Sequence, residues 1–251
     1  MSDEQAWDER YRESDRIWSG NPNVELVTEV AGLPPGRALD LGCGEGADAV
    51  WLARRGWQVT AVDISGVALE RAARHAADAG VRIDFQQHDL EKTFPAGTFD
   101  LISAQFLHFW EEFDREKILR KAADAMAPGG ILLIEGHMDH GPFRNQQVGH
   151  GGQQGHEGTD AHEGTDGHEG TDGREGADAY EGADGHEGAE GHGHEGHHHV
   201  HFPTPEEVIA ALDLGDGWEV LKAEVHPRHQ KGPDGDDHVR TDSTVKLRRK
   251  L

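Results

Sequence analysis

The sequence has little of several features that would place it in a common class of protein. It holds a single cysteine, Cys43, which excludes an internal disulfide framework. Lys and Arg number 24 against 48 Asp and Glu, and a net charge of −24 argues against binding to DNA or RNA, because phosphate contacts need cationic side chains. Apolar runs such as residues 131–134 are far too short to span a membrane. The acidic residues 1–5 do not resemble a signal peptide, so we expect a cytoplasmic protein.

Apolar residues are also scarce, at 35% of the chain, and the shortage is concentrated between residues 145 and 199. This segment holds 16 of the 34 glycines, 13 acidic residues, 10 histidines and one arginine. A six-residue repeat such as His-Glu-Gly-Thr-Asp-Gly runs through it, without the large aliphatic residues that fill a β-helix. A segment with nothing to bury cannot offset its ordering entropy. We therefore predict that residues 145–199 are a disordered insertion in a single domain, which consists of residues 1–144 and 200–251.

The histidines of this insertion are candidate metal ligands, because imidazoles and carboxylates at high density favour Zn²⁺, Ni²⁺, Cu²⁺ or Co²⁺. Spacing on a flexible chain does not define a ligand set, so the sequence predicts a divalent metal without selecting one. The alternative is a solvated acidic linker that expanded by repeat slippage. The candidate ligands are His156, His162, His168, His186, His192, His194, His197, His198 and His199.

The rest of the chain alternates short apolar runs with helical patterns. This alternation predicts an α/β fold with a doubly wound, mostly parallel, seven-stranded sheet and a C-terminal antiparallel hairpin. Such sheets bind ligands at the carboxyl ends of their strands. Pro128 to Gly130 is expected to stop the third helix, and Ser65 and Thr204 are expected to cap the second and fourth. The strands are predicted at 37–41, 58–63, 82–87, 99–104, 131–135, 218–225 and 241–247, and the helices at 45–55, 66–79, 115–126 and 205–212.

The most informative stretch runs from Ala38 to Gly46, where a strand enters a glycine turn that opens a helix. Gly42 and Gly44 let the backbone turn sharply and approach a ligand closely. Taken alone, Gly42-x-Gly44-x-x-Ala47 also satisfies the dinucleotide fingerprint. Asp40 suits a cationic amino-acid moiety and repels a pyrophosphate, and Glu45 adds to that repulsion.

Two further strand ends fit a nucleoside. Asp63 ends the second strand, where a carboxylate can bind both hydroxyls of a ribose. Asp89 and Leu90 follow the third strand and offer a carboxylate to an adenine amino group and an apolar contact to its ring. Each residue has a structural alternative: the glycines can serve helix–sheet packing, Asp63 can be a solvated acid, and Asp89 can form a turn.

With these motifs, the chain resembles the class I S-adenosylmethionine-dependent methyltransferases. The resemblance covers about residues 24–135 and, more loosely, the two final strands. It implies a Rossmann-like fold with S-adenosylmethionine as cofactor: Asp40, Gly42 and Gly44 at its methionine end, Asp63 on the ribose, Ile64, Asp89 and Leu90 at the adenine, and Gln105 near the sulfonium. Five motifs carry it in family order: Leu39-Asp-Leu-Gly-Cys-Gly-Glu-Gly46, Val59-Thr-Ala-Val-Asp-Ile64, His88-Asp-Leu90, Phe99-Asp-Leu-Ile-Ser103 and Pro128-Gly-Gly-x-Leu-Leu133.

The resemblance implies methyl transfer to a small-molecule acceptor. The N-terminal stretch from Ala6 to Asn23 looks like the cofactor-covering segment of the tellurite- and thiopurine-methylating branch. Trp18 would then cover the cofactor, or else it is an ordinary core anchor. His108 and His137 follow the fourth and fifth strands and are candidate catalytic bases, with a structural role as the alternative for each.

Two other functions stay open at this point. One is a metal-handling protein built on a methyltransferase scaffold, which the histidine-rich insertion favours. The other is nicotinamide-dependent oxidoreduction, which would require a phosphate to lie beside Asp40. No Asn-Pro-Pro-Tyr-like run follows the fourth strand, which disfavours methylation of DNA bases and leaves a small molecule as the expected partner.

Overall fold

The computed structural model describes residues 2–107, 114–138, 202–231 and 237–251. The chain divides into two compact units. The first comprises Met1–Asp139, His201–Arg228 and Thr241–Leu251, and the second comprises His140–Val200 and His229–Arg240. Within the second unit, only the distal ends of the last two strands are described. The insertion at 145–199 lies outside the described residues, so the single domain made of 1–144 and 200–251 stays a prediction.

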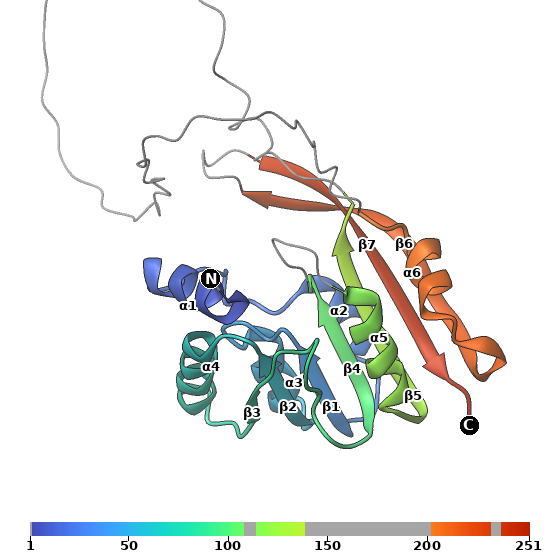
Figure 1. Cartoon of the computed structure of the whole chain (residues 1–251), viewed down its shortest axis with the longest axis horizontal. Helices are drawn as coiled ribbons and strands as arrows, with labels where there is room; N and C mark the ends of the chain where they lie inside the picture. Colours follow the sequence, from blue (N-terminus) through green and yellow to red (C-terminus); the bar gives the residue numbers. More distant parts are fainter. Residues whose placement is uncertain (1, 108–113, 139–201, 232–236) are drawn as a thin grey trace, which may run out of the picture. The chain divides into compact units, whose positions relative to one another are not determined.

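The described residues form one seven-stranded sheet in the order β3-β2-β1-β4-β5-β7-β6 (Figure 1). Strands β1 to β5 run parallel to one another, and β7 runs antiparallel to β5. This confirms the predicted mostly parallel sheet and its C-terminal antiparallel hairpin. The strands are β1 (Arg37–Leu41), β2 (Gln58–Asp63), β3 (Asp84–Gln87), β4 (Phe99–Gln105), β5 (Met126–His137), β6 (Trp218–Lys231) and β7 (Asp237–Arg249).

The four predicted helices are present, and two more precede them along the chain. Ser65 and Thr204 cap α4 and α6 as expected, each accepting a backbone N–H of the first turn. Ser2 and Gln5 form a capping box at the start of α1, which the sequence analysis did not use. The helices are α1 (Asp3–Glu13), α2 (Val24–Val30), α3 (Ala47–Arg54), α4 (Gly66–Asp78), α5 (Arg115–Asp124) and α6 (Pro205–Leu212).

The boundary between α5 and β5 differs from the prediction. The helix ends at Asp124, and β5 begins at Met126, two residues before Pro128. The backbone N–H of Phe99 donates to the carbonyl of Ala125 at 2.9 Å, and Met126 pairs with Phe99 across the sheet. Pairing with β4 therefore ends the helix before Pro128 is reached, and the prediction that Pro128 to Gly130 stops it was wrong.

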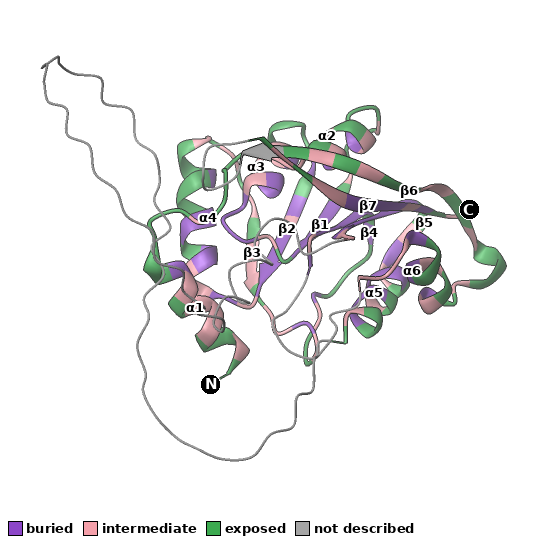
Figure 2. Cartoon of the chain, turned by 90° about the horizontal axis from the view of Figure 1, so that it is seen from above, coloured by how far each residue is buried: buried purple, intermediate pink, exposed green. Residues whose placement is uncertain are grey.

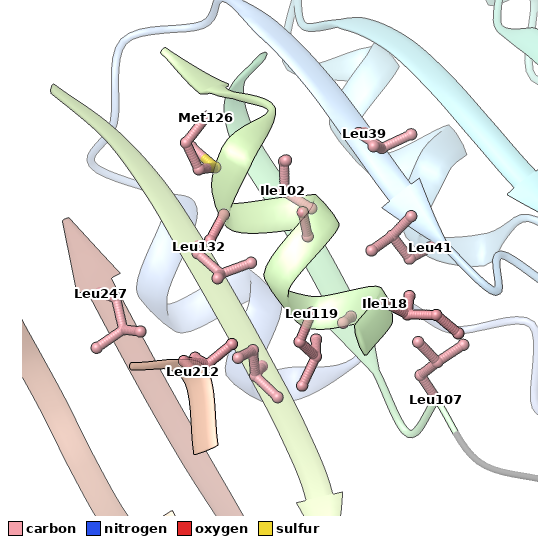
Figure 3. Close-up of a cluster of buried hydrophobic side chains, with 14 of the residues drawn as sticks. Leu39, Leu41, Ile102, Leu107, Ile118, Leu119, Met126, Leu132, Leu212 and Leu247 are labelled. Atoms are coloured by element: carbon pink, nitrogen blue, oxygen red, sulfur yellow. The ribbon is translucent and has the colours of Figure 1, made fainter. Parts of the chain in front are cut away.

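Each face of the sheet buries its own apolar cluster, and strand residues alternate between the two. On one face, residues such as Leu39 and Leu132 pack with α5 and α6 (Figure 3). On the other, residues such as Ala38 and Leu133 pack with α2 and α3. The strands between these layers are largely buried (Figure 2). Asp40 has the same parity as Ala38 and therefore lies on the α2–α3 face, at the carboxyl end of β1.

Candidate functional site

The glycine turn after β1 is anchored to the end of β2. The backbone N–H groups of Gly42 and Cys43 both donate to the carbonyl of Val62 at 2.9 Å. Gly42 and Gly44 have φ angles of 70° and 51°, a region that side chains rarely adopt. A Cβ on Gly42 would lie 2.8 Å from Cδ1 of Leu107, the end of a flexible side chain, so the backbone conformation is the main reason for glycine here.

Asp63 joins this turn to the start of α4. Its Oδ2 accepts the backbone N–H of Gly44 at 2.8 Å, and its Oδ1 accepts that of Ser65 at 2.9 Å. Burial raises the pKa of Asp63 despite these hydrogen bonds. Each carboxylate oxygen has a second lone pair that can accept another donor. Asp63 is therefore a buried strand-end carboxylate, not a solvated acid, and it positions the turn as well as offering acceptor sites.

The N-terminal segment is fastened over the turn by Glu45. Its carboxylate accepts the backbone N–H groups of Ile17 and Trp18 at 3.3 and 3.1 Å, and pairs with Nη1 of Arg71 on α4 at 2.9 Å. Nε1 of Trp18 donates to Oη of Tyr11 at 3.0 Å. Both atoms lie beside Gly44, 3.2 and 3.1 Å from where its Cβ would be. Trp18 thus covers the glycine turn. Tyr11 and Arg71 are site residues that sequence reasoning did not identify, and it had given Glu45 only a role in repelling phosphate.

Of the three residues predicted to contact the adenine, two line one cavity and the third lies in the apolar core. Ile64 and Asp89 line one cavity of about 300 Å³, together with Ser2, Asp3, Glu4, Gln87 and Lys92. Leu90 instead belongs to the apolar core on the α5–α6 face. Although partial burial opposes the shift, a hydrogen bond from Lys92 lowers the pKa of Asp89. The cavity brings two of the three adenine candidates together, with a carboxylate that stays ionised near neutral pH.

Three buried acceptor atoms that have no hydrogen-bond partner among the described residues mark the carboxyl ends of β1, β4 and β5. They are Oδ2 of Asp40, Oε1 of Gln105 and Oε2 of Glu135. The strand register pairs Asp40 with Ser103, and Gln105 with Glu135, so all three residues share the α2–α3 face. Buried acceptors without partners are costly, and a ligand that donates hydrogen bonds or carries positive charge would satisfy them.

Carboxyl groups dominate the electrostatics of this edge. Burial, followed by the charges of Asp48 and Asp63, raises the pKa of Asp40 well above its usual value. Burial also raises the pKa of Glu135, to about 8. A cationic ligand would stabilise the charged form of these carboxyl groups and lower their pKa again, whereas a pyrophosphate would raise it further. The residues present therefore fit the sulfonium and ammonium groups of S-adenosylmethionine better than a dinucleotide.

The two candidate bases have different outcomes. His108 lies outside the described residues. His137, at the end of β5, donates from Nδ1 to Oδ1 of Asp242 on β7 at 2.8 Å. The predicted metal ligands between His156 and His199 also lie outside the described residues. In the described part of the chain, no group of three or more His, Cys, Asp or Glu is placed to hold a metal ion.

The sheet order and the glycine turn after β1 define an α/β domain of the Rossmann-like class. Residues 38–130 match the family described as "Methyltransferase domain". Ubiquinone biosynthesis O-methyltransferase from Caulobacter sp. (strain K31) is 36% identical over 100 residues, which cover 39% of this chain and 39% of that protein. The chain thus spans less than half of that relative. Residues 38–130 thus match a methyltransferase domain, as the five sequence motifs imply.

Two solved structures share the fold over nearly the whole chain. One, described as "Conversion of a Disulfide Bond into a Thioacetal Group during Echinomycin Biosynthesis", has a TM-score of 0.63 and 22% identity, covering 99% of this chain and 92% of the other. The second, TehB from Haemophilus influenzae, has a TM-score of 0.56 and 16% identity, covering 100% and 68%. At these identities, the likeness shows the fold alone. Among the described helices, none is long and apolar enough to cross a membrane.

Proposed function

We propose that this protein transfers a methyl group from S-adenosylmethionine to a small-molecule acceptor. The observation that carries the proposal is the set of buried polar groups at the carboxyl ends of β1, β4 and β5. Among the described residues, Asp40, Gln105 and Glu135 each have one buried acceptor oxygen without a hydrogen-bond partner. This set lies beside a glycine turn within the matched methyltransferase domain. Such a site favours a cationic nucleoside over a pyrophosphate, and so disfavours nicotinamide-dependent oxidoreduction.

Each part of the cofactor would have its own residues. Asp40 and Gln105 would accept hydrogen bonds from the methionine end, next to the backbone of Gly42 and Gly44. Asp63 would accept the ribose hydroxyls through its remaining lone pairs. Ile64 and Asp89 would contact the adenine in the cavity that they line.

The N-terminal segment would exclude water from this site. Trp18 lies over the glycine turn, held through its backbone by Glu45. When bound, S-adenosylmethionine supplies a methyl group on a sulfonium, and the protein's part is to hold the acceptor close and in line with that methyl. The cytoplasmic location expected from the sequence remains part of this proposal.

Calorimetry with the purified protein tests the proposal directly. S-adenosylmethionine is expected to bind with a Kd in the micromolar range, about −7 to −8 kcal/mol. Under the same conditions NAD is expected to give no binding heat, because its pyrophosphate would face Asp40 and Glu45. Folded protein that does not bind S-adenosylmethionine, or that prefers NAD, would refute the proposed function.

A second proposal concerns the histidine-rich segment and rests on its composition. We propose that residues 145–199 bind divalent metal, because histidine recurs in a six-residue repeat that is also rich in carboxylates. Replacing residues 145–199 by a short Gly–Ser linker is expected to abolish Ni²⁺ binding and to leave S-adenosylmethionine affinity within about twofold.

A length-matched control separates metal ligation from the mere presence of the insertion. It keeps residues 145–199 but replaces their histidines with asparagine, and is expected to lose Ni²⁺ binding equally. In the wild-type protein, metal uptake should fall as the pH drops through about 6.5, because protonated imidazoles cannot ligate. Metal binding that survives the histidine replacements would contradict the assignment. If methyl transfer is lost together with the segment, the two functions are coupled.

A further inference from the structure

Six polar side chains form two parallel rows across β5, β7 and β6, at the carboxyl end of β5. In the first row, Glu135 faces Thr244, and Nε2 of His226 lies 2.8 Å from Oγ1 of Thr244. In the second row, His137 faces Asp242, and Nε of Arg228 donates to Oδ2 of Asp242. We call this set the polar ladder; its members are Glu135, His137, His226, Arg228, Asp242 and Thr244.

The ladder continues the buried face of β5 beyond its apolar core. Ile131 and Leu133 pack with α2 and α3, and every second residue of a strand lies on the same face. Glu135 and His137 are the next two residues on that face. Gln105 pairs with Glu135, so the residue expected near the sulfonium stands at the end of the first row.

Asp242 fixes the orientation of His137. Its side chain is fully buried, and its two oxygens bind His137 and Arg228. Because a carboxylate only accepts hydrogen bonds, Nδ1 of His137 carries the proton in the neutral imidazole and Nε2 is the basic nitrogen. Although burial opposes the shift, the hydrogen bond from His137 and the charge of Arg228 lower the pKa of Asp242, so it remains ionised.

Phe106 connects the ladder to the end of β4. Its ring stacks on His137 with centroids 4.5 Å apart, and the guanidinium of Arg228 lies 5.0 Å from the same ring. The φ angle of Phe106 is 51°, a strained value for a residue other than glycine. Strain of this kind concentrates at functional sites. Here it places an aromatic ring against the imidazole, directly after Gln105.

In a polar network that only stabilises the fold, we expect every buried polar atom to have a hydrogen-bond partner, and the polar ladder does not meet this expectation. Oε2 of Glu135 and Oε1 of Gln105 are buried without partners at the end of the first row. A buried polar network with unpaired atoms stabilises the folded state less than apolar side chains of the same shape would. The second row, by contrast, is bonded from strand to strand. The ladder thus presents open acceptors next to a firmly oriented imidazole.

We propose that His137 is the general base of the reaction, that Asp242 is its positioning residue, and that the methyl acceptor is the oxygen or sulfur of a hydroxyl or thiol. This inference rests on the proposed methyl transfer. The acceptor's lone pair forms the new bond to the methyl carbon, and the electron pair of the broken carbon–sulfur bond leaves with the sulfur. The acceptor's proton passes to Nε2 of His137, and the negative charge of Asp242 stabilises the resulting imidazolium. An acceptor that is already ionised would have no use for this pair.

The charged and titratable groups around His137 set its pH response. In the described residues they are Asp242 on β7, Arg228 and His226 on β6, Glu135 on its own strand, and Arg115, whose Nη2 donates to the Glu135 carbonyl. Glu25 and Asp48 act on Glu135 from α2 and α3. Because burial raises the pKa of Glu135 to about 8, it is mostly uncharged near neutral pH and competes little with His137 for the proton.

The first experiment replaces the base. With the best acceptor from a panel of phenols, alcohols, thiols and amines, His137→Ala is expected to lower kcat by about 100- to 10,000-fold. The affinity for S-adenosylmethionine, measured by calorimetry, is expected to stay within about twofold. Added imidazole should restore part of the rate, and the acid limb of the wild-type pH profile should disappear. His137→Gln gives a second variant should the alanine protein fail to fold.

The second experiment tests positioning. Asp242→Asn is expected to lower kcat more than it changes KM and to move the acid limb to lower pH, because the imidazolium loses its carboxylate partner. Asp100→Asn is the matched control, since Asp100 accepts the backbone N–H of Arg37 at 2.8 Å, at the amino end of β1. It should leave kcat and the pH profile unchanged. In ¹⁵N-histidine NMR spectra, the resonance that disappears in His137→Ala should titrate at lower pH in Asp242→Asn.

Several results would overturn the inference while leaving the proposed function intact. They are wild-type kcat in His137→Ala, a loss of kcat that imidazole does not restore, and an unchanged NMR titration in Asp242→Asn. Methylation of amines alone, or a wholly unreactive panel with protein that binds S-adenosylmethionine, would refute the hydroxyl or thiol acceptor. Folded protein that does not bind S-adenosylmethionine would refute the proposed function and the inference together.

Discussion

Asp63→Ala is expected to weaken the binding of S-adenosylmethionine by about 100- to 1,000-fold, as measured by calorimetry. The substitution removes two things at once: the acceptors for the ribose hydroxyls and the anchor that holds the backbone N–H of Gly44 at 2.8 Å. Hydrogen bonds to a charged group contribute about 1.5–3 kcal/mol each, so losing two bonds near the lower end, about 3–4 kcal/mol in total, accounts for the expected loss. The expected loss lies in affinity, because no proton-transfer role is assigned to Asp63.

Asp100→Ala is the matched control for Asp63→Ala. Asp100 also accepts a backbone N–H, that of Arg37, but at the opposite edge of the sheet. Its replacement should leave the affinity within about twofold. Asp63→Asn keeps the side-chain shape and should lose affinity by about tenfold, which provides a second measurement if the alanine variant does not fold. A folded Asp63→Ala protein with near-wild-type affinity would reject the ribose assignment.

Glu135→Gln is expected to stabilise the unliganded protein, increasingly so as the pH rises. Burial raises the pKa of Glu135 from 4.5 to about 8 in the folded state. A group with a raised folded-state pKa contributes stability that is present below its unfolded pKa and is lost as the pH rises through its folded pKa. The glutamine side chain of the variant does not ionise, so the gain in unfolding free energy should grow by about 4 kcal/mol between pH 5 and pH 9.

Thermal unfolding at several pH values measures this effect. A gain of about 4 kcal/mol corresponds to a difference in Tm of about 8–16 °C for a chain of this size. Comparing the two proteins at each pH cancels the titration of the other carboxyl groups. Glu116→Gln makes the same chemical change on the exposed side of α5 and should leave the pH dependence unaltered. Parallel Tm curves for the wild-type protein and Glu135→Gln would show that Glu135 is not held in a charge-destabilising environment.

The central strands could be predicted from the sequence to the residue because local signals agree there. β1 and β2 match their predicted bounds, since an apolar run at each is closed by a glycine turn or by Asp63. β5 began earlier than predicted, because pairing with Phe99 draws Met126 into the sheet. α2, with seven residues, is too short for its periodicity to stand out.

A site residue could be predicted only where the same short segment contains both the residue and the strand end that positions it. Asp63 and Ile64 adjoin each other at a strand end, and the structure brings Ile64 to a cavity with Asp89. Glu45 pairs with Arg71, which lies 26 residues away and shares no motif with it. Leu90 was predicted to contact the adenine, but it lies in the apolar core. The sequence does not distinguish these positions, because an apolar residue after a strand can face either a ligand or the core.

The position of β7 between β5 and β6 also sets when the site can form during synthesis. Asp242 follows His137 by 105 residues, and β7 is the last strand in chain order. A nascent chain that has emerged only as far as β6 would leave the long edge of β5 without a hydrogen-bonding partner, and such edges promote aggregation. Its imidazole would also lack the carboxylate that orients it. Completion of the sheet and assembly of the His137–Asp242 pair are therefore one event, so the proposed base would be oriented only once β7 has paired with β5.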